Sequence, residues 1–313
     1  MLPDPRLADL PLVVALLALA LWLIATRHDR SAIIGFTAYG LIVAIVWVRL
    51  GALDVALTEA ALGGIMGLLL LMAAARLGDA PDGPPPTWPL RVLVGLLCGA
   101  VTAGLAVLVL TLPEPAPNLV AAVAEQQSAT ALKNPVAAVL VAFRAVDTLL
   151  ESAVLALAVI GLWSVGADAA WGERPRALDS DAPDPALVLL ARLLPPVGLV
   201  VGVHLFWTGA DHPGGPFQAG ALLAAMVALV WLARLGAPPP VRSRLTRVGL
   251  MLGPLVFLLI GLAGVVAADA YLAYPEALTK PLILLIEAAK TLSVAVALAL
   301  LVAGPPALPR ARP

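Results

Sequence analysis

The chain of 313 residues is 61% hydrophobic and only 12% charged, with a formal net charge of −1. Soluble domains carry about 25% charged residues, so the composition excludes an ordinary soluble protein. With no basic cluster among aromatic residues it also gives no indication of nucleic-acid binding. One cysteine, Cys98, lies in an apolar run and excludes both a disulfide framework and a cysteine metal site.

Nine apolar segments follow one another along the chain, and a helix needs about 20 mostly apolar residues to cross the bilayer. They lie at residues 10–26, 31–48, 55–75, 90–112, 136–166, 187–207, 216–235, 248–268 and 282–302. The first has neither a cationic leader nor a cleavage site, so we expect it to be retained. The fifth is longer than one span requires and predicts a helix that starts late, tilts or projects from the membrane. The sequence thus predicts an all-α, polytopic bundle of about nine spans in the cell (inner) membrane.

The distribution of Lys and Arg predicts the orientation. With nine spans, one side of the membrane collects Arg27, Arg30, Arg76, Arg91, Arg174, Arg176, Arg192, Arg234, Arg242, Arg244, Arg247, Arg310 and Arg312. The other side collects only Arg6, Arg49, Lys133 and Lys280. Positive loops stay inside, so we expect the N-terminus outside and the C-terminus in the cytoplasm.

Small residues recur at helical spacing in two of the segments. Gly63, Gly64 and Gly67 lie in the third segment, and Gly95 and Gly99 in the fourth. Such spacing favours close contact between helices within lipid, with a partner helix in this chain or in another.

Ionisable residues within apolar helices mark candidate ion or proton paths, because their insertion costs about 2.5–3.5 kcal/mol each. Asp54 and Glu59 open the third segment. Asp54 suits a helix N-cap, where a carboxylate also meets the helix dipole favourably. Glu59 lies at least one turn deeper, so capping does not account for it, and protonation or ion contact is the functional alternative.

The fifth segment carries Arg144, Asp147 and Glu151 at spacings of three and four. These spacings place the three side chains on one stripe of an otherwise apolar helix. Counting from Pro135 at about 1.5 Å per residue puts Asp147 near the middle of the bilayer. A packing ion pair explains Arg144 and Asp147, but it leaves Glu151 as a spare buried carboxylate, which is the kind of group that exchanges protons.

The ninth segment carries Glu287 and Lys290, three residues apart on one face. A buried lysine can load and release a proton when a neighbouring glutamate tunes it. A simple intrahelical ion pair is the alternative.

Several weaker candidates remain. His204 on an apolar helix fits a packing role, and His212 follows Asp211 in a loop without a third nearby ligand, so we predict no metal site. The loop continues as Pro-Gly-Gly-Pro, a tight turn with positive φ at its glycines, and Gln218 then offers an amide to a neighbouring helix. No catalytic or cofactor-binding motif is present, so the prediction is a non-enzyme without a cofactor.

Three stretches resemble the Mrp-type multisubunit Na⁺/H⁺ antiporters. Residues 53–63 (L-D-V-A-L-T-E-A-A-L-G) look like the C-terminal hydrophobic module of the large A-type chain, which is also found as a small, separate chain of membrane-bound hydrogenases. Residues 134–151 (N-P-V-A-A-V-L-V-A-F-R-A-V-D-T-L-L-E) resemble the adjoining module. From about residue 187 the chain is similar to the B-type chain of these antiporters, including the loop H-P-G-G-P-F-Q-A-G at 212–220. Pro216 replaces a glycine of that pattern, and Lys290 stands where a small or apolar residue is expected.

The resemblance implies three modules: a three-helix module at 1–89, a two-helix module at 90–182 and a four-helix domain of the antiporter B type at 183–313. It implies that Glu59, Arg144, Asp147 and Glu151 occupy positions that line the cation or proton route. It also implies a subunit that transports Na⁺ and H⁺ only together with large A and D chains and small C, E, F and G-type chains. A membrane arm of an ion-pumping redox complex is the alternative, and a purely structural scaffold is a third possibility. The ion, its stoichiometry, the full list of partners and the oligomeric state stay open.

Overall fold

The computed structural model describes residues 5–77, 87–113, 118–175 and 183–308, and these residues form helices and no strand. Seven helices are long and apolar enough to cross a membrane, and two shorter apolar helices, Asp9–Ala25 and Pro216–Leu232, complete the set in the described part. The all-α, multi-pass prediction is therefore confirmed. The predicted orientation of the termini stays a prediction.

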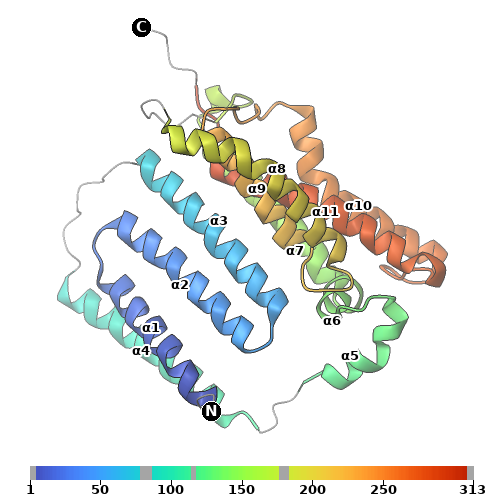
Figure 1. The fold of residues 1–313 in the computed structure, drawn as a ribbon, viewed down its shortest axis with the longest axis horizontal. Helices are drawn as coiled ribbons and strands as arrows, with labels where there is room; N and C mark the ends of the chain where they lie inside the picture. The colour runs from blue at the N-terminus through green and yellow to red at the C-terminus, as the bar shows by residue number, and fades with distance from the viewer. Residues whose placement is uncertain (1–4, 78–86, 114–117, 176–182, 309–313) are drawn as a thin grey trace.

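The first three helices form one layer of the molecule (Figure 1). They are α1 (Pro5–Ala25), α2 (Asp29–Arg49) and α3 (Leu53–Leu77). Glycines hold α2 and α3 close: a Cβ built on Gly63 would lie 3.6 Å from the Cα of Gly40, and one on Gly67 would meet the side chain of Thr37. Gly63 and Gly67 thus find their partner helix within this chain, where small residues allow close approach, whereas a Cβ on Gly64 would meet nothing within 4 Å.

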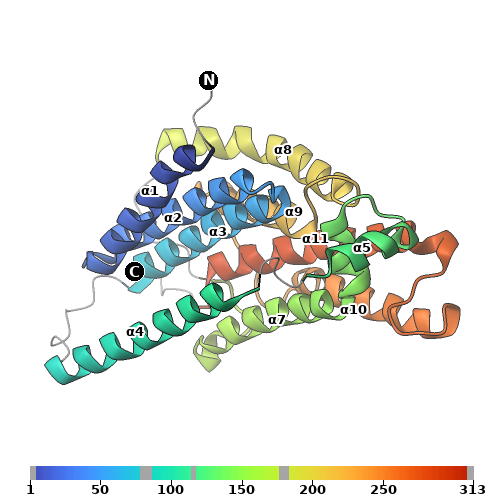
Figure 2. The ribbon, with the colours of Figure 1, turned by 90° about the horizontal axis from the view of Figure 1, so that it is seen from below.

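Helix α4 (Trp88–Thr111) stands apart from the rest. It overlaps α1 in Figure 1 but lies well away from it in Figure 2. None of its apolar window is buried (0%), and a Cβ on Gly95 or Gly99 would meet nothing within 4 Å. Its small-residue face therefore has no partner among the described residues.

The fifth predicted span, 136–166, is interrupted, and its long helix starts late, which is one of the three alternatives expected for this segment. The chain forms α5 (Val120–Gln126), a 3₁₀ turn (Gln127–Thr130), α6 (Pro135–Ala138), a π-helical segment η2 (Val139–Phe143) and then α7 (Ala145–Ser164). Arg144 breaks the regular geometry, with φ −124° and ψ 35°. All five residues of η2 are apolar, so their sequence does not predict this break.

Side-chain hydroxyl groups satisfy carbonyl groups that the break exposes. Thr148 Oγ1 donates to the carbonyl of Leu140 at 2.5 Å, and Tyr274 Oη donates to the carbonyl of Val141 at 2.9 Å. An unpaired carbonyl costs several kcal/mol in hydrocarbon, so such partners are required wherever a transmembrane helix is irregular. Burial raises the pKa of Tyr274 to about 12, so its hydroxyl stays a donor at physiological pH.

The second half of the chain packs around its last helix. Helices α8 (Pro185–Thr208), α9 (Pro216–Leu232) and α10 (Arg244–Ala267) lie around α11 (Thr279–Ala303), which also contacts α7 and α3 (Figure 2). Two-thirds of the α11 window (67%) is buried, so α11 is the core of the molecule. Further 3₁₀ turns lie at Asp168–Ala170 and Glu276–Leu278.

Three segments join at one end of the bundle through backbone hydrogen bonds. The nitrogens of Val241 and Arg242 donate to the carbonyls of Glu173 and Gly172 at 3.1 and 3.2 Å, and that of Ala307 donates to the carbonyl of Arg174 at 3.1 Å. These segments belong to the arginine-rich side that the sequence predicts to be cytoplasmic.

A small side chain at Gly253 should disturb the core. A Cβ there would lie 2.7 Å from Ser293 Oγ and 3.1 Å from the Cα of Lys290, so Gly253→Ala must push α10 away from α11. Overpacking costs about 1–3 kcal/mol, which we expect to lower the melting temperature of the full chain in detergent. Gly161→Ala is the matched control, because its Cβ meets nothing within 4 Å and alanine is the better helix former. Equal melting temperatures for the two variants would contradict this packing.

Candidate functional site

A cavity of about 510 Å³ opens where the three predicted modules meet. Its wall is formed by α3, the π-helical segment, α7, the loop before α9, and α11. Four ionisable side chains, two threonines and one amide line it: Asp54, Glu151, Glu287, Lys290, Thr58, Thr148 and Gln218. Of the ten residues predicted as candidates, five thus lie in one cavity, although they are far apart in the sequence.

Asp54 joins all three modules through its carboxylate and does not cap α3 as predicted. Helix α3 begins at Leu53, so Asp54 already lies in the first turn. Its Oδ1 accepts hydrogen bonds from Asn134 Nδ2 at 3.2 Å and from the nitrogen of Gly214 at 3.1 Å. The carboxylate therefore ties α3 to the start of α6 and to the loop before α9.

Asn134 is the other half of this junction and was not among the predicted site residues. Its Nδ2 also donates to the carbonyls of Gly209 and His212, both at 3.1 Å, and its Oδ1 accepts from the nitrogen of Val136 at 2.9 Å. A signal was present in the sequence, because an asparagine directly before a proline at a helix start favours an N-cap.

The loop before α9 behaves as its sequence predicted. Gly214 and Gly215 have φ values of 149° and 141°, which disfavour residues with a Cβ. A Cβ on Gly214 would also lie 2.6 Å from the carbonyl oxygen of Leu205. Gln218 then reaches the neighbouring helix, donating from Nε2 to Thr58 Oγ1 at 2.8 Å and to the carbonyl of Asp54 at 3.3 Å.

The predicted buried stripe on the fifth helix is wrong in two respects. Arg144 and Asp147 form an ion pair, but their side chains are 71% and 55% exposed, and neither lines the cavity. Glu151 is not spare, because Lys290 Nζ lies 3.7 Å from its Oε2, and its side chain is 51% exposed. Asp147 and Glu151 keep their four-residue spacing within α7, and Glu151 lines the cavity because Lys290 on α11 pairs with it.

Glu287 and Lys290 are the most deeply buried charges of the site, at 2% and 4% exposure. The ion pair of Lys290 is with Glu151 on α7, and not simply within its own helix. Glu287 Oε2 is buried without any hydrogen-bond partner among the described residues. A buried carboxylate oxygen without a donor is costly and indicates a proton or ion position.

The remaining predicted residues lie outside the cavity. Glu59 is half-buried, with Oε1 3.6 Å from the Cβ position of Gly40 on α2. His204 and His212 are exposed, and only their carbonyl oxygens accept hydrogen bonds, from Thr208 and Asn134. No group of three or more His, Cys, Asp or Glu side chains able to hold a metal ion occurs among the described residues.

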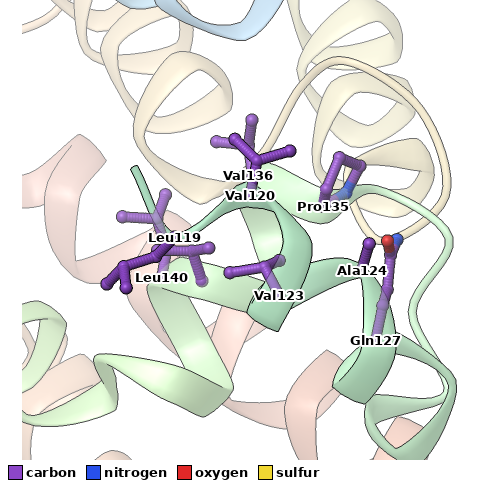
Figure 3. A pocket seen from close by; sticks show the side chains of 9 residues that line it. Leu119, Val120, Val123, Ala124, Gln127, Pro135, Val136 and Leu140 are labelled. Carbon is purple, nitrogen blue, oxygen red and sulfur yellow. The ribbon is translucent and has the colours of Figure 1, made fainter. Parts of the chain in front are cut away.

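A second cavity, of about 640 Å³, lies between α5 and the α6–η2 segment (Figure 3). Its lining is apolar apart from Gln127, whose Nε2 donates to the carbonyl of Lys133 at 2.8 Å. Because it offers no charged group, this cavity is not a candidate for an ion site.

Two family models match parts of the chain. Residues 14–79 match the MbhD family, named for the D-type chain of MBH, and residues 186–305 match the "Domain related to MnhB subunit of Na+/H+ antiporter". No curated protein matches the chain.

Two solved complexes contain a chain with a similar fold. The Mrp complex from Dietzia sp. DQ12-45-1b matches at 23% identity with a TM-score of 0.74, over 94% of this chain and 34% of that one. The membrane-bound sulfane sulfur reductase (MBS), an archaeal respiratory membrane complex, matches at 25% identity with a TM-score of 0.55, over 68% of this chain and 96% of that one. The chain thus spans about a third of the Mrp chain that it matches.

Loss of the Asn134 amide should loosen the junction. Asn134→Ala removes three hydrogen bonds to other segments, so we expect a melting temperature several degrees lower and faster proteolysis of the loop at 209–215. The matched control is Asp184→Ala, because Asp184 makes the same local cap, accepting from Ala186 N at 2.7 Å, outside the junction. An equal effect of both variants would show that only the local cap matters.

The Asp211–Lys280 pair gives a pH-dependent prediction. The hydrogen bond from Lys280 Nζ, at 2.8 Å, lowers the pKa of Asp211 below its usual 3.8. Stability from a lowered carboxyl pKa is present above the unfolded value and is lost as pH falls through the folded one. The side chains are 38% and 29% exposed, so the pair contributes at most about 1 kcal/mol.

We therefore expect Asp211→Asn to lower the melting temperature slightly at neutral pH. The gap from the wild type should shrink as pH falls below 3.8. Thermal unfolding in detergent between pH 3 and 7 measures this gap, and a gap that stays constant with pH would rule out a role for the Asp211 charge.

Proposed function

We propose that this chain, an Mrp-type antiporter subunit that joins an MbhD-type module to an MnhB-related domain, contributes its charged cavity to the ion path of a cation/proton antiporter complex. The chain is a multi-pass membrane protein, and its described residues include no large extramembrane segment that could hold a separate active site. Transport must therefore use groups within the bundle.

The cavity is the observation that carries this proposal. Three carboxylates and one ammonium gather among otherwise apolar helices, where each ionisable group is costly and usually functional. The cavity wall includes the π-helical segment, and irregular backbone at membrane depth is typical of segments that line an ion or substrate site. A packing role alone does not explain both the charges and the broken helix.

The three carboxylates have different roles in this proposal. Glu151 is half-exposed and forms the outer position, where ions exchange with a neighbouring subunit or water. Glu287 is the inner position, because it is buried and one oxygen lacks a donor among the described residues. Asp54 holds the junction of the modules at the rim of the cavity. We also propose that the chain divides into three modules, at residues 1–89, 90–182 and 183–313.

The remaining subunits complete the path. Large A- and D-type chains and small C-, E-, F- and G-type chains are the partners we propose, with Na⁺ and H⁺ as the transported ions. The match to about a third of a longer chain of an Mrp complex supports a part that works within a larger assembly.

A second candidate function is a membrane arm of an ion-pumping redox complex. The match of residues 14–79 to the MbhD family and the fold shared with a chain of the membrane-bound sulfane sulfur reductase favour it. Affinity purification of the native complex separates the two candidate functions. Co-purification of antiporter subunits alone would favour the antiporter, whereas co-purification of iron–sulfur subunits would favour the redox complex.

Neutralising the cavity carboxylates should impair exchange. We expect Glu287→Gln and Glu151→Gln to reduce ΔpH-driven Na⁺ exchange at least tenfold in vesicles that hold the complete complex. Glu125→Gln, a neutralised exposed carboxylate on α5, is the matched control and should keep full exchange. Subunit composition after purification verifies that each complex is assembled.

Asp147→Asn distinguishes the cavity from the stripe predicted from sequence. Asp147 does not line the cavity, so the variant should retain exchange if the cavity is the path. Loss in Asp147→Asn together with full exchange in Glu287→Gln would move the path to the Arg144–Asp147 face of α7.

A further inference from the structure

We infer that Lys290 makes this cavity selective for protons over Na⁺, because its ammonium group occupies the position that a bound alkali cation would take. The inference rests on the proposed function and concerns which ion this part of the path carries. The observation behind it is one buried ammonium group within a set of three carboxylates, where a Na⁺ site would present oxygen atoms alone.

Two helices determine where the ammonium group lies: α11, which carries Lys290, and α7, which carries its partner Glu151. Lys290 Nζ lies 3.7 Å from Glu151 Oε2 on α7. Glu287 precedes it by three residues on α11, which places the two side chains on one face. Asp54 on α3 is the remaining charged group of the cavity lining. One positive charge thus lies beside the carboxylate from α7 and on the same face as that of Glu287 on α11, while the Asp54 carboxylate is held by Asn134 and Gly214.

The base of the Lys290 side chain is held in place by α10. The Cβ position of Gly253 lies only 3.1 Å from the Cα of Lys290, so the two helices are in close contact there. Only the four-carbon stem and the ammonium group can move, and the cavity is the space that they share with Glu151 and Glu287. In this structure the positive charge therefore lies in the cavity, beside the carboxylates that Na⁺ would need.

A proton can pass where Na⁺ cannot. The Lys290 side chain first moves from Glu151 to within hydrogen-bond distance of Glu287 Oε2, which has no partner among the described residues. Lys290 then donates a proton to that oxygen: an N–H bond breaks and an O–H bond forms, leaving a neutral amine and a neutral carboxylic acid. A protonated Glu151 then transfers its proton to the amine, which restores the ammonium and leaves the Glu151 carboxylate. The net result is one proton moved from the half-exposed to the buried carboxylate.

Removing the ammonium group should turn the cavity into a Na⁺ site. With Lys290→Gln, the carboxylates lose their internal cation, and the amide adds an oxygen ligand for a hard cation. We expect the purified complex to bind one additional Na⁺ per chain, measured with radioactive Na⁺ at equilibrium. Lys290→Gln combined with Glu287→Gln should lose this additional ion, and Lys290→Arg, which keeps the charge, should not gain it.

Two results would overturn the inference. One is a Lys290→Gln complex that assembles but binds no additional Na⁺. The other is a wild-type complex that loses a bound Na⁺ when Glu287 is changed to Gln, since the cavity then holds Na⁺ beside the lysine. This second comparison decides the matter if Lys290→Gln fails to assemble. Binding is measured without transport, so its outcome is separate from that of the exchange assays.

Discussion

The cost of placing charge inside an apolar helix bundle determines the arrangement of this protein. Lys290 and Glu287 lie on α11, the most deeply buried helix, where an isolated charge is strongly unfavourable. Lys290 is tolerated because Glu151 on α7 supplies the opposite charge at 3.7 Å. That contact requires α7 to approach α11 at Lys290. The residues from α3, the π-helical segment and the loop before α9 meet around the same cavity.

The broken fifth helix lies next to this contact, and its exposed carbonyl groups have partners. A straight helix from Pro135 to Ser164 would keep Arg144, Asp147 and Glu151 on one face, as the sequence pattern predicts. The π-helical segment and Arg144 interrupt the helix before α7, whereas Asp147 and Glu151 keep their four-residue spacing within it. Glu151 lines the cavity because Lys290 on α11 pairs with it, while the Arg144–Asp147 pair lies outside the lining. The carbonyls freed by the break accept from Thr148 and Tyr274, which are themselves held by α7 and by the loop before α11.

The sequence was sufficient for the helices and insufficient for their contacts. Eight of the nine apolar runs each correspond to one apolar helix, because about 20 such residues can do little else in a bilayer, and the fifth is divided. The π-helical segment escaped prediction, since Val139–Phe143 is as apolar as a regular helix would be. Asp54 looked like a cap because capping is a local pattern, whereas its true partners, Asn134 and Gly214, come from distant segments. The pairing of Glu151 with Lys290 is likewise a property of the packed bundle and not of either helix.

The exposed charges at the start of α7 indicate a surface that other subunits or water cover in an assembly. Arg144, Asp147 and Glu151 have side chains between 51% and 71% exposed on a helix that is otherwise apolar. Charges facing lipid at such positions are expensive, so in a membrane this face requires protein or water against it. Helix α4 adds a second uncovered surface, whose glycines meet no neighbour among the described residues. Both surfaces belong to the region between the two family-matched segments, at residues 80–185, and a covering helix there would complete the outer wall of the path at Glu151.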